Sequence, residues 1–99
     1  MAEAGAEEDA AVAAAEAELR GYLDREGRLL MWPSKGAKKL HAVRWMARLF
    51  SSGRTYSERE VNEILKSNHL FDDHALLRRE LFEQGYLGRT PDGKSYWRQ

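Results

Sequence analysis

RTYSEREVNEILKSNHLFDDHALLRRELFEQGYLGRTPDGKSYWR, residues 54–98, decides the fold of this 99-residue chain. Its first signal marks the start of a helix. Ser57 and Glu60 form an S-x-x-E capping box, in which the hydroxyl accepts a free N–H of the first turn and the carboxylate reaches back to the N-cap N–H. We expect this helix to end near residues 67–68. The apolar residues of its buried face are Val61, Ile64 and Leu65.

A second helix and a hairpin follow. Asp72 or Asp73 caps the helix, because a carboxylate suits the free N–H groups and the positive end of the helix dipole. Gly85 supplies the left-handed residue that ends it. Residues 86–98 then form a two-stranded wing with Pro-Asp-Gly at its tip, residues 91–93. This order of elements predicts a mainly helical α+β domain of the winged helix-turn-helix type, a module that usually contacts nucleic acid.

The chain upstream adds further elements. Residues 1–8 are rich in Ala and Glu, so we expect a disordered acidic tail, and residues 9–99 are predicted to form a single winged-helix-like domain. The extra N-terminal helix should run from about Asp9 to Gly27. An extended segment or edge strand over 28–32 and a helix over 36–51 should follow.

Trp45 stands on that second upstream helix, on the side opposite the predicted core stripe of Leu40, Val43, Ala47 and Phe50. Among neighbouring cations it could stack on a base or hold an arginine. We favour burial under the N-terminal helix, because a large indole is more often buried than displayed.

Composition removes several classes of protein. Cysteine is absent, which excludes disulfides, thiol catalysis and cysteine-ligated zinc. No apolar run approaches the ~20 residues that cross a bilayer, and no secretory signal is visible. These features fit a cytoplasmic protein.

Charge is unevenly distributed, although 16 basic and 16 acidic residues balance overall. The first fifteen residues carry four acidic side chains and no basic one, whereas residues 28–54 carry seven basic side chains and no acidic one. Such a basic stretch fits a polyanion partner, and equally a solvated helix face. Within this basic stretch, we predict that Lys38, Lys39 and Arg48 form a secondary basic surface for nucleic acid.

The motif YSEREVNEIL together with DDHALLRRELFEQGYLGRTPDGKSYWR resembles a bacterial family of uncharacterised small domains. The resemblance covers about residues 28–98, and its most distinctive points are Arg78-Arg79 before Glu80-Leu81 and the closing Tyr96-Trp97. Members of that family occur alone or at the C-terminus of helix-turn-helix transcriptional regulators, and this chain would be a stand-alone member. The resemblance implies a winged-helix-like fold and a role in transcription, without a known activity.

Double-stranded DNA is the first partner that the pattern suggests. In a winged helix-turn-helix the second helix of the motif, here residues 73–84, enters the major groove. The side chains predicted to contact DNA are Arg78, Arg79, Arg89 and Lys94, with Lys38, Lys39 and Arg48 as the secondary surface. Leu76, Phe82 and Glu83 argue against base recognition, because a helix that reads bases usually offers polar donors at such positions.

A protein-interaction or dimerisation module of a regulatory system is the alternative. Apolar residues on the outer side of the helix, beside an aromatic-rich wing, could form a binding patch. The residues of this alternative are Leu76, Phe82, Tyr96 and Trp97.

Catalysis has little support in the sequence. The cluster NHLFDDH at residues 68–74 matches no common metal-ligand spacing, and its aspartates already serve as helix caps. We expect His69 to be satisfied within the turn. Glycine-rich phosphate loops and nucleophile elbows are missing too. We therefore predict a protein that is not an enzyme and has neither metal nor cofactor.

Overall fold

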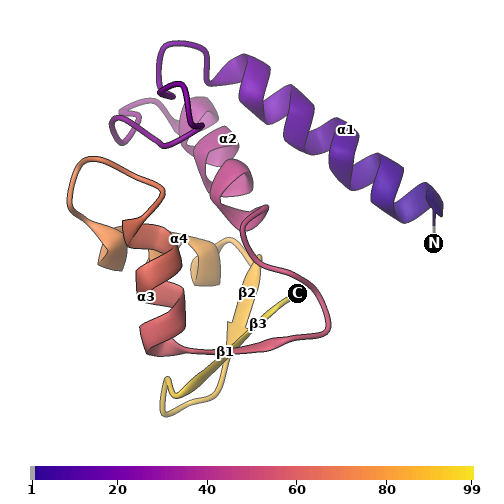
Figure 1. The fold of residues 1–99 in the computed structure, drawn as a ribbon, viewed down its shortest axis with the longest axis vertical. Helices are drawn as coiled ribbons and strands as arrows, with labels where there is room; N and C mark the ends of the chain where they lie inside the picture. Colours follow the sequence, from indigo (N-terminus) through magenta and orange to yellow (C-terminus); the bar gives the residue numbers. More distant parts are fainter. Residues whose placement is uncertain (1) are drawn as a thin grey trace.

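The computed structural model describes the backbone of residues 2–99 and the side chains of residues 8–99. Within this part, four helices accompany a three-stranded antiparallel sheet (Figure 1). The elements are α1 (Ala2–Glu18), α2 (Gly36–Ala47), β1 (Thr55–Ser57), α3 (Glu58–Lys66), α4 (His74–Glu83), β2 (Leu87–Arg89) and β3 (Ser95–Arg98). The predicted α+β, mainly helical class is confirmed. Helix α1 begins at Ala2, ahead of the predicted start near Asp9 and within the stretch predicted as a disordered tail. The side chains of residues 1–7 lie outside the described part of the chain.

The sheet contains one strand more than predicted. Its order is β1-β3-β2, so the expected two-stranded arrangement is wrong in this respect. Residues 55–57 pair with β3, and the buried Tyr56 anchors them in the core. The Tyr56 ring packs edge-on against the Phe50 ring, with 5.3 Å between the two ring centroids. The Tyr56 hydroxyl accepts a hydrogen bond from the backbone N–H of Ser51 at 2.8 Å.

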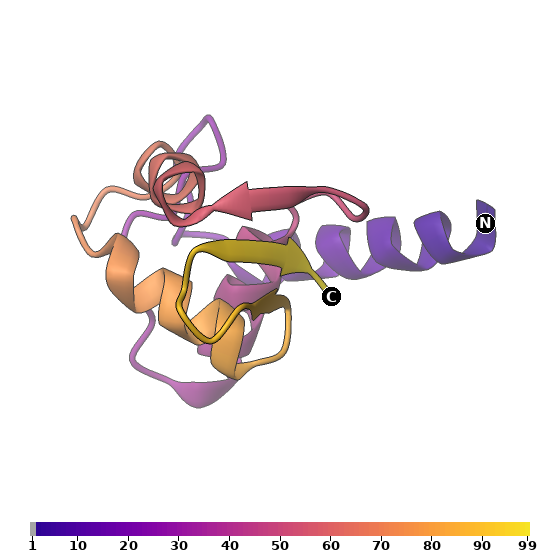
Figure 2. The ribbon, with the colours of Figure 1, turned by 90° about the horizontal axis from the view of Figure 1, so that it is seen from below.

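Helix α1 is shorter at its C-terminal end than predicted. It ends at Glu18, and Gly21 then adopts the left-handed conformation with φ of 91°, which a helix cannot continue through. Ala15 and Leu19 are fully buried, and α1 contacts α2. The N-terminal end of α1 projects away from the rest of the molecule (Figures 1 and 2).

The α3–turn–α4 unit forms as the sequence predicts. Ser57 and Glu60 complete the capping box, and Asp73 accepts a hydrogen bond from the backbone N–H of Leu76 at 3.2 Å as the cap of α4. Gly85 follows α4 with φ of 82°. Local hydrogen-bonding chemistry therefore sets the boundaries of both helices.

The turn between α3 and α4 is held by His69. The backbone N–H of Asp73 donates to its Nε2 at 2.9 Å, so the proton is on Nδ1, which lies 2.6 Å from the carbonyl oxygen of Leu65. Two backbone hydrogen bonds join Leu29 to this turn: the Leu29 N–H donates to the Asn68 carbonyl oxygen, and the Leu70 N–H donates to the Leu29 carbonyl oxygen. The predicted extended segment at 28–32 thus makes a bridge to this turn rather than a strand. As expected, His69 is satisfied within the turn.

Trp45 is buried, as favoured from its size. Its Nε1 donates to the carbonyl oxygen of Gly27 at 2.8 Å, in the turn that follows α1. Leu40, expected in the core stripe of α2, is instead 56% exposed. The indole therefore contributes to the core from the side of α2 that the pattern had assigned to the surface.

Candidate nucleic-acid interface

A groove of about 410 Å³ separates α4 from the β2–β3 hairpin. Leu77 and Leu81 face the core, so the opposite side of α4 is left to form one wall. The hairpin forms the other wall, and Figure 2 shows it lying beside α4. The residues that line the groove are Ala75, Arg78, Arg79, Phe82, Glu83, Arg89 and Tyr96.

Arg89 and Phe82 join the two walls. The guanidinium carbon of Arg89 lies 4.4 Å from the centroid of the Phe82 ring. Sheet register explains the contact, because Arg89 pairs with Tyr96, which is fully buried on the helix side of the sheet. Cation–π contacts at exposed sites contribute about 0.5–1 kcal/mol. Phe82 therefore holds an arginine over the groove.

Arg78 makes contacts to the neighbouring helix. Its Nη1 donates to the side-chain oxygen of Asn62 on α3, and its Nε lies 3.6 Å from the carboxylate of Glu58. The same carboxylate accepts a hydrogen bond from the Tyr96 hydroxyl at 3.3 Å. Only 23% of the Arg78 side chain is exposed. This arginine ties α4 to α3 and β3.

Arg79, Arg89 and Lys94 present their charge to solvent. Among residues 8–99, none of these three side chains forms a salt bridge. Lys94 lies at the hairpin tip, where Asp92 accepts hydrogen bonds from the Thr90 hydroxyl at 2.6 Å and the Lys94 N–H at 3.0 Å. These bonds hold the pKa of Asp92 below its ordinary value.

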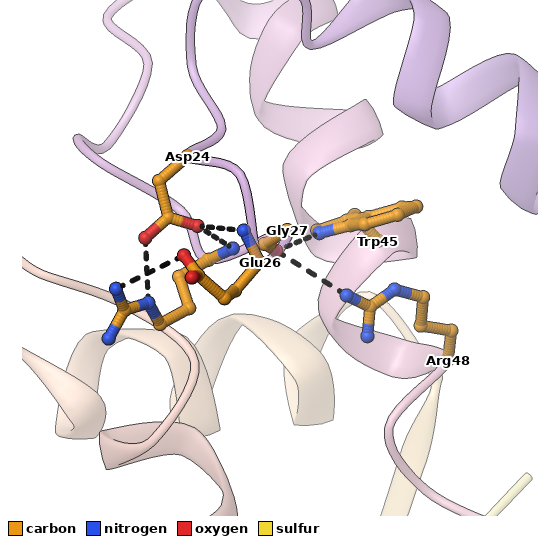
Figure 3. Close-up of polar contacts among 6 residues, drawn as sticks. Asp24, Glu26, Gly27, Trp45 and Arg48 are labelled. Carbon is orange, nitrogen blue, oxygen red and sulfur yellow. Dashed lines mark hydrogen bonds and ion pairs between the residues drawn. The ribbon is translucent and has the colours of Figure 1, made fainter.

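The predicted secondary basic surface is largely occupied by contacts within the chain. Lys38 lies 3.2 Å from the Glu18 carboxylate at the end of α1. Arg48 lies over the Trp45 ring, 3.7 Å from its centroid, and donates to the Gly27 carbonyl at 3.4 Å (Figure 3). Burial lowers the pKa of Arg48, although nearby Glu16 opposes this shift. Lys39 is half-buried on the same helix.

The loop between α1 and α2, which contains Gly27, is ordered by Asp24. Its Oδ1 accepts hydrogen bonds from the backbone N–H groups of Glu26 at 3.0 Å and Arg28 at 2.8 Å (Figure 3). Gly27 has φ of 78°, and a Cβ there would come within 3.2 Å of the Trp45 ring. Trp45 and Arg48 therefore serve to attach this loop to α2.

The four residues of the alternative protein-binding set do not share one surface. Leu76 is half-buried and Tyr96 is fully buried, so a partner could not reach Tyr96 in this fold. Trp97 is 37% exposed on the opposite face of the sheet from Tyr96, where its indole covers Gly88. Phe82 remains as the exposed apolar residue on the groove side.

Residues 28–98 match the model of a protein family described as an uncharacterised protein conserved in bacteria, DUF2087. The chain belongs to this family. No curated protein and no solved structure was found to match it. Within the described residues, no helix is long and apolar enough to cross a membrane.

The DUF2087 region contains every residue that lines the groove, whereas α1 lies outside it. Within that region, Glu58 and Asn62 are residues that sequence reasoning missed. Glu58 stands in the first turn of α3 and Asn62 one turn later, so their common side of the helix was the available signal. Their contact with Arg78 follows only from the packing of α4 against α3.

Proposed function

We propose that this DUF2087 protein is a winged helix-turn-helix protein that binds double-stranded DNA through α4 and the β2–β3 hairpin, in a transcription-related role. The order of elements from α2 to β3 supports this assignment. In such a fold α3 and α4 are the helix-turn-helix, α4 faces the major groove, and the β2–β3 hairpin is the wing. Strand β1 would complete the small sheet at the base of the wing.

The position of three cations that form no salt bridge within residues 8–99 carries the proposal. Arg79 and Arg89 line the groove, and Lys94 lies at the tip of the hairpin that forms one of its walls. Lys and Arg side chains that neutralise phosphates supply most of the affinity of proteins for DNA. Because these side chains are free of salt bridges within residues 8–99, their charge is available to such a partner.

Phe82 favours the proposal, although its apolar ring argued against DNA contact at the level of sequence. The ring supports the guanidinium of Arg89 and so helps to place a cation between helix and hairpin. Glu83 remains an unfavourable charge on this side. The secondary basic surface on α2 is a weaker candidate, since Lys38 and Arg48 are engaged with α1 and the following loop.

A protein-binding module has less support than DNA binding. Tyr96 and Trp97 lie on opposite faces of the sheet, and Tyr96 is inaccessible. Phe82 would have to give up its contact with Arg89 to serve as an apolar anchor. We therefore place the functional surface at the groove and its cations.

Titration of a labelled random-sequence duplex pool tests the proposal. We expect binding at about 50 mM salt that weakens steeply towards about 200 mM. Exchanging Arg79→Ala together with Lys94→Ala should weaken binding at the lower salt concentration. Absence of duplex binding by the intact chain at about 50 mM salt would show that the proposal is wrong.

A further inference from the structure

We infer that the groove between α4 and the β2–β3 hairpin is a clamp for the sugar–phosphate backbone, in which Arg79 and Arg89 hold phosphate oxygens, and that duplex binding is therefore largely independent of base sequence. This inference rests on the proposed DNA-binding function and specifies its chemistry. Two arginines approach the groove from different walls, one from the helix and one from strand β2.

Arg89 is held in a position suited to phosphate. Its guanidinium carbon lies 4.4 Å from the centroid of the Phe82 ring, so the ring supports the group from the side of α4. Among residues 8–99, the guanidinium N–H groups donate no hydrogen bond and form no salt bridge, so they are available to a ligand. A guanidinium edge offers two parallel donors that match two phosphate oxygens, which is the geometry of a bidentate contact.

Arg79 stands on the same wall as Phe82, because positions three apart on a helix are neighbours. It is exposed and forms no salt bridge within residues 8–99. Arg79 therefore lies one turn along α4 from the ring that carries Arg89. Both arginines line the groove, which has a volume of about 410 Å³.

Apart from His74 and Arg79, the accessible side of α4 offers few side chains that could read bases. Ala75 and Leu76, in the N-terminal half that normally contacts base edges, carry no hydrogen-bonding side-chain group. Arg78 and Asn62 have suitable groups, but Arg78 donates to Asn62 itself. Contacts to phosphate position a protein on DNA without carrying sequence information. The side chains of this interface are thus suited mainly to position the protein on the phosphate backbone rather than to distinguish base sequences.

The salt dependence of binding tests the clamp. The intact chain, Arg79→Gln and Arg89→Gln are titrated with two labelled duplexes of equal length and unrelated sequence, over about 50–200 mM salt. Each substitution should reduce the magnitude of the slope of log K against log salt by about 1 on both duplexes. Arg25→Gln is the matched control, because Arg25 is an exposed arginine in the loop after α1 and outside the groove. It should leave the slope unchanged.

Two results would overturn the clamp while leaving the DNA-binding proposal in place. One is an unchanged slope in both Arg79→Gln and Arg89→Gln, with the variants folded by circular dichroism. The other is enrichment of a single sequence motif when the intact chain selects from a random duplex pool. Failure of the intact chain to bind any duplex at about 50 mM salt would overturn the proposed function itself.

Discussion

The guanidinium of Arg89 lies 4.4 Å from the ring centroid of Phe82, which links strand β2 to helix α4 across a groove. The two residues are only seven positions apart, and the left-handed Gly85 between them turns the chain back. The contact explains why an exposed aromatic ring lies on a charged surface: the ring supports the Arg89 guanidinium. It also predicts that Phe82 affects DNA binding through Arg89.

Replacing the Phe82 ring tests this link. Phe82→Leu removes the cation–π contact, so we expect duplex affinity at low salt to fall about two- to fivefold, corresponding to about 0.5–1 kcal/mol. The free energy of unfolding should change by less than about 1 kcal/mol, since Phe82 is 38% exposed. Phe82→Tyr keeps an aromatic face and should bind like the unmodified chain. Equal affinities for the leucine and tyrosine variants would refute this role of the ring.

The adjacent arginines Arg78 and Arg79 should separate stability from binding. Arg78→Ala removes the donor to the Asn62 side chain and the cation beside Glu58. We expect a loss of about 1–3 kcal/mol in the free energy of unfolding. Arg79→Ala removes an exposed side chain and should change the free energy of unfolding by less than about 0.5 kcal/mol. Denaturant unfolding of both variants measures the difference. Equal stability of the two would contradict a structural role for Arg78.

Duplex titration of the same pair gives a complementary measurement. Arg79→Ala should bind DNA more weakly at low salt while remaining as stable as the unmodified chain. Normal DNA binding by Arg79→Ala would show that Arg79 does not contact phosphate, which would contradict the proposed clamp.

Gly88 has a structural requirement that depends on Trp97. A Cβ at this position would lie 2.4 Å from the Trp97 Nε1, so the indole must move. We expect Gly88→Ala to lower the free energy of unfolding by about 1–3 kcal/mol, as overpacking usually does. Gly36→Ala is the control, because nothing lies within 4 Å of the added carbon at the start of α2. A Gly88→Ala variant as stable as Gly36→Ala would show that the indole moves away at no cost.

Glu60 predicts how stability depends on pH. The Ser57 N–H, and then the Arg54 guanidinium, hold the pKa of its carboxyl below the ordinary value of 4.5. The unfolded chain therefore takes up this proton first as pH falls. The stabilisation is complete above about pH 4.5 and is lost as pH falls through the lower pKa of the folded state.

We therefore expect Glu60→Gln to be less stable than the unmodified chain at pH 7, with a difference that shrinks as the pH falls below about 4.5. Denaturant unfolding over this range measures it. Glu63→Gln, on the exposed part of the same helix, should have a small effect, since its pair with Arg59 is largely solvated. A Glu60→Gln difference that stays constant with pH would contradict the assignment.

Much of the fold could be predicted because its signals are local. The capping box of Ser57 and Glu60, the cap at Asp73 and the left-handed Gly85 act within a few residues, and each forms as expected. Strand β1 could not be predicted in this way, because its partner Ser95–Arg98 lies about forty positions away. The end of α1 was misplaced because Gly21 and Gly27 are both left-handed, and sequence alone does not show which one stops the helix.

The candidate site divides in the same way. Arg79, Arg89 and Lys94 could be proposed from their places on the helix and hairpin, whereas the different role of Arg78 depends on Asn62 in another helix. The support that Phe82 gives to Arg89 likewise required the hairpin to be packed against α4. Pairwise tertiary contacts decide which arginines are free.

Backbone amide NMR of the intact chain during titration with a duplex at about 50 mM salt tests the central claim most directly. The claim is that α4 and the β2–β3 hairpin together form the DNA-binding surface. It predicts the largest shift changes at Arg79, Arg89 and Lys94, with small changes along α2. Changes confined to α1 and α2, or a spectrum that the duplex leaves unaltered, would contradict it.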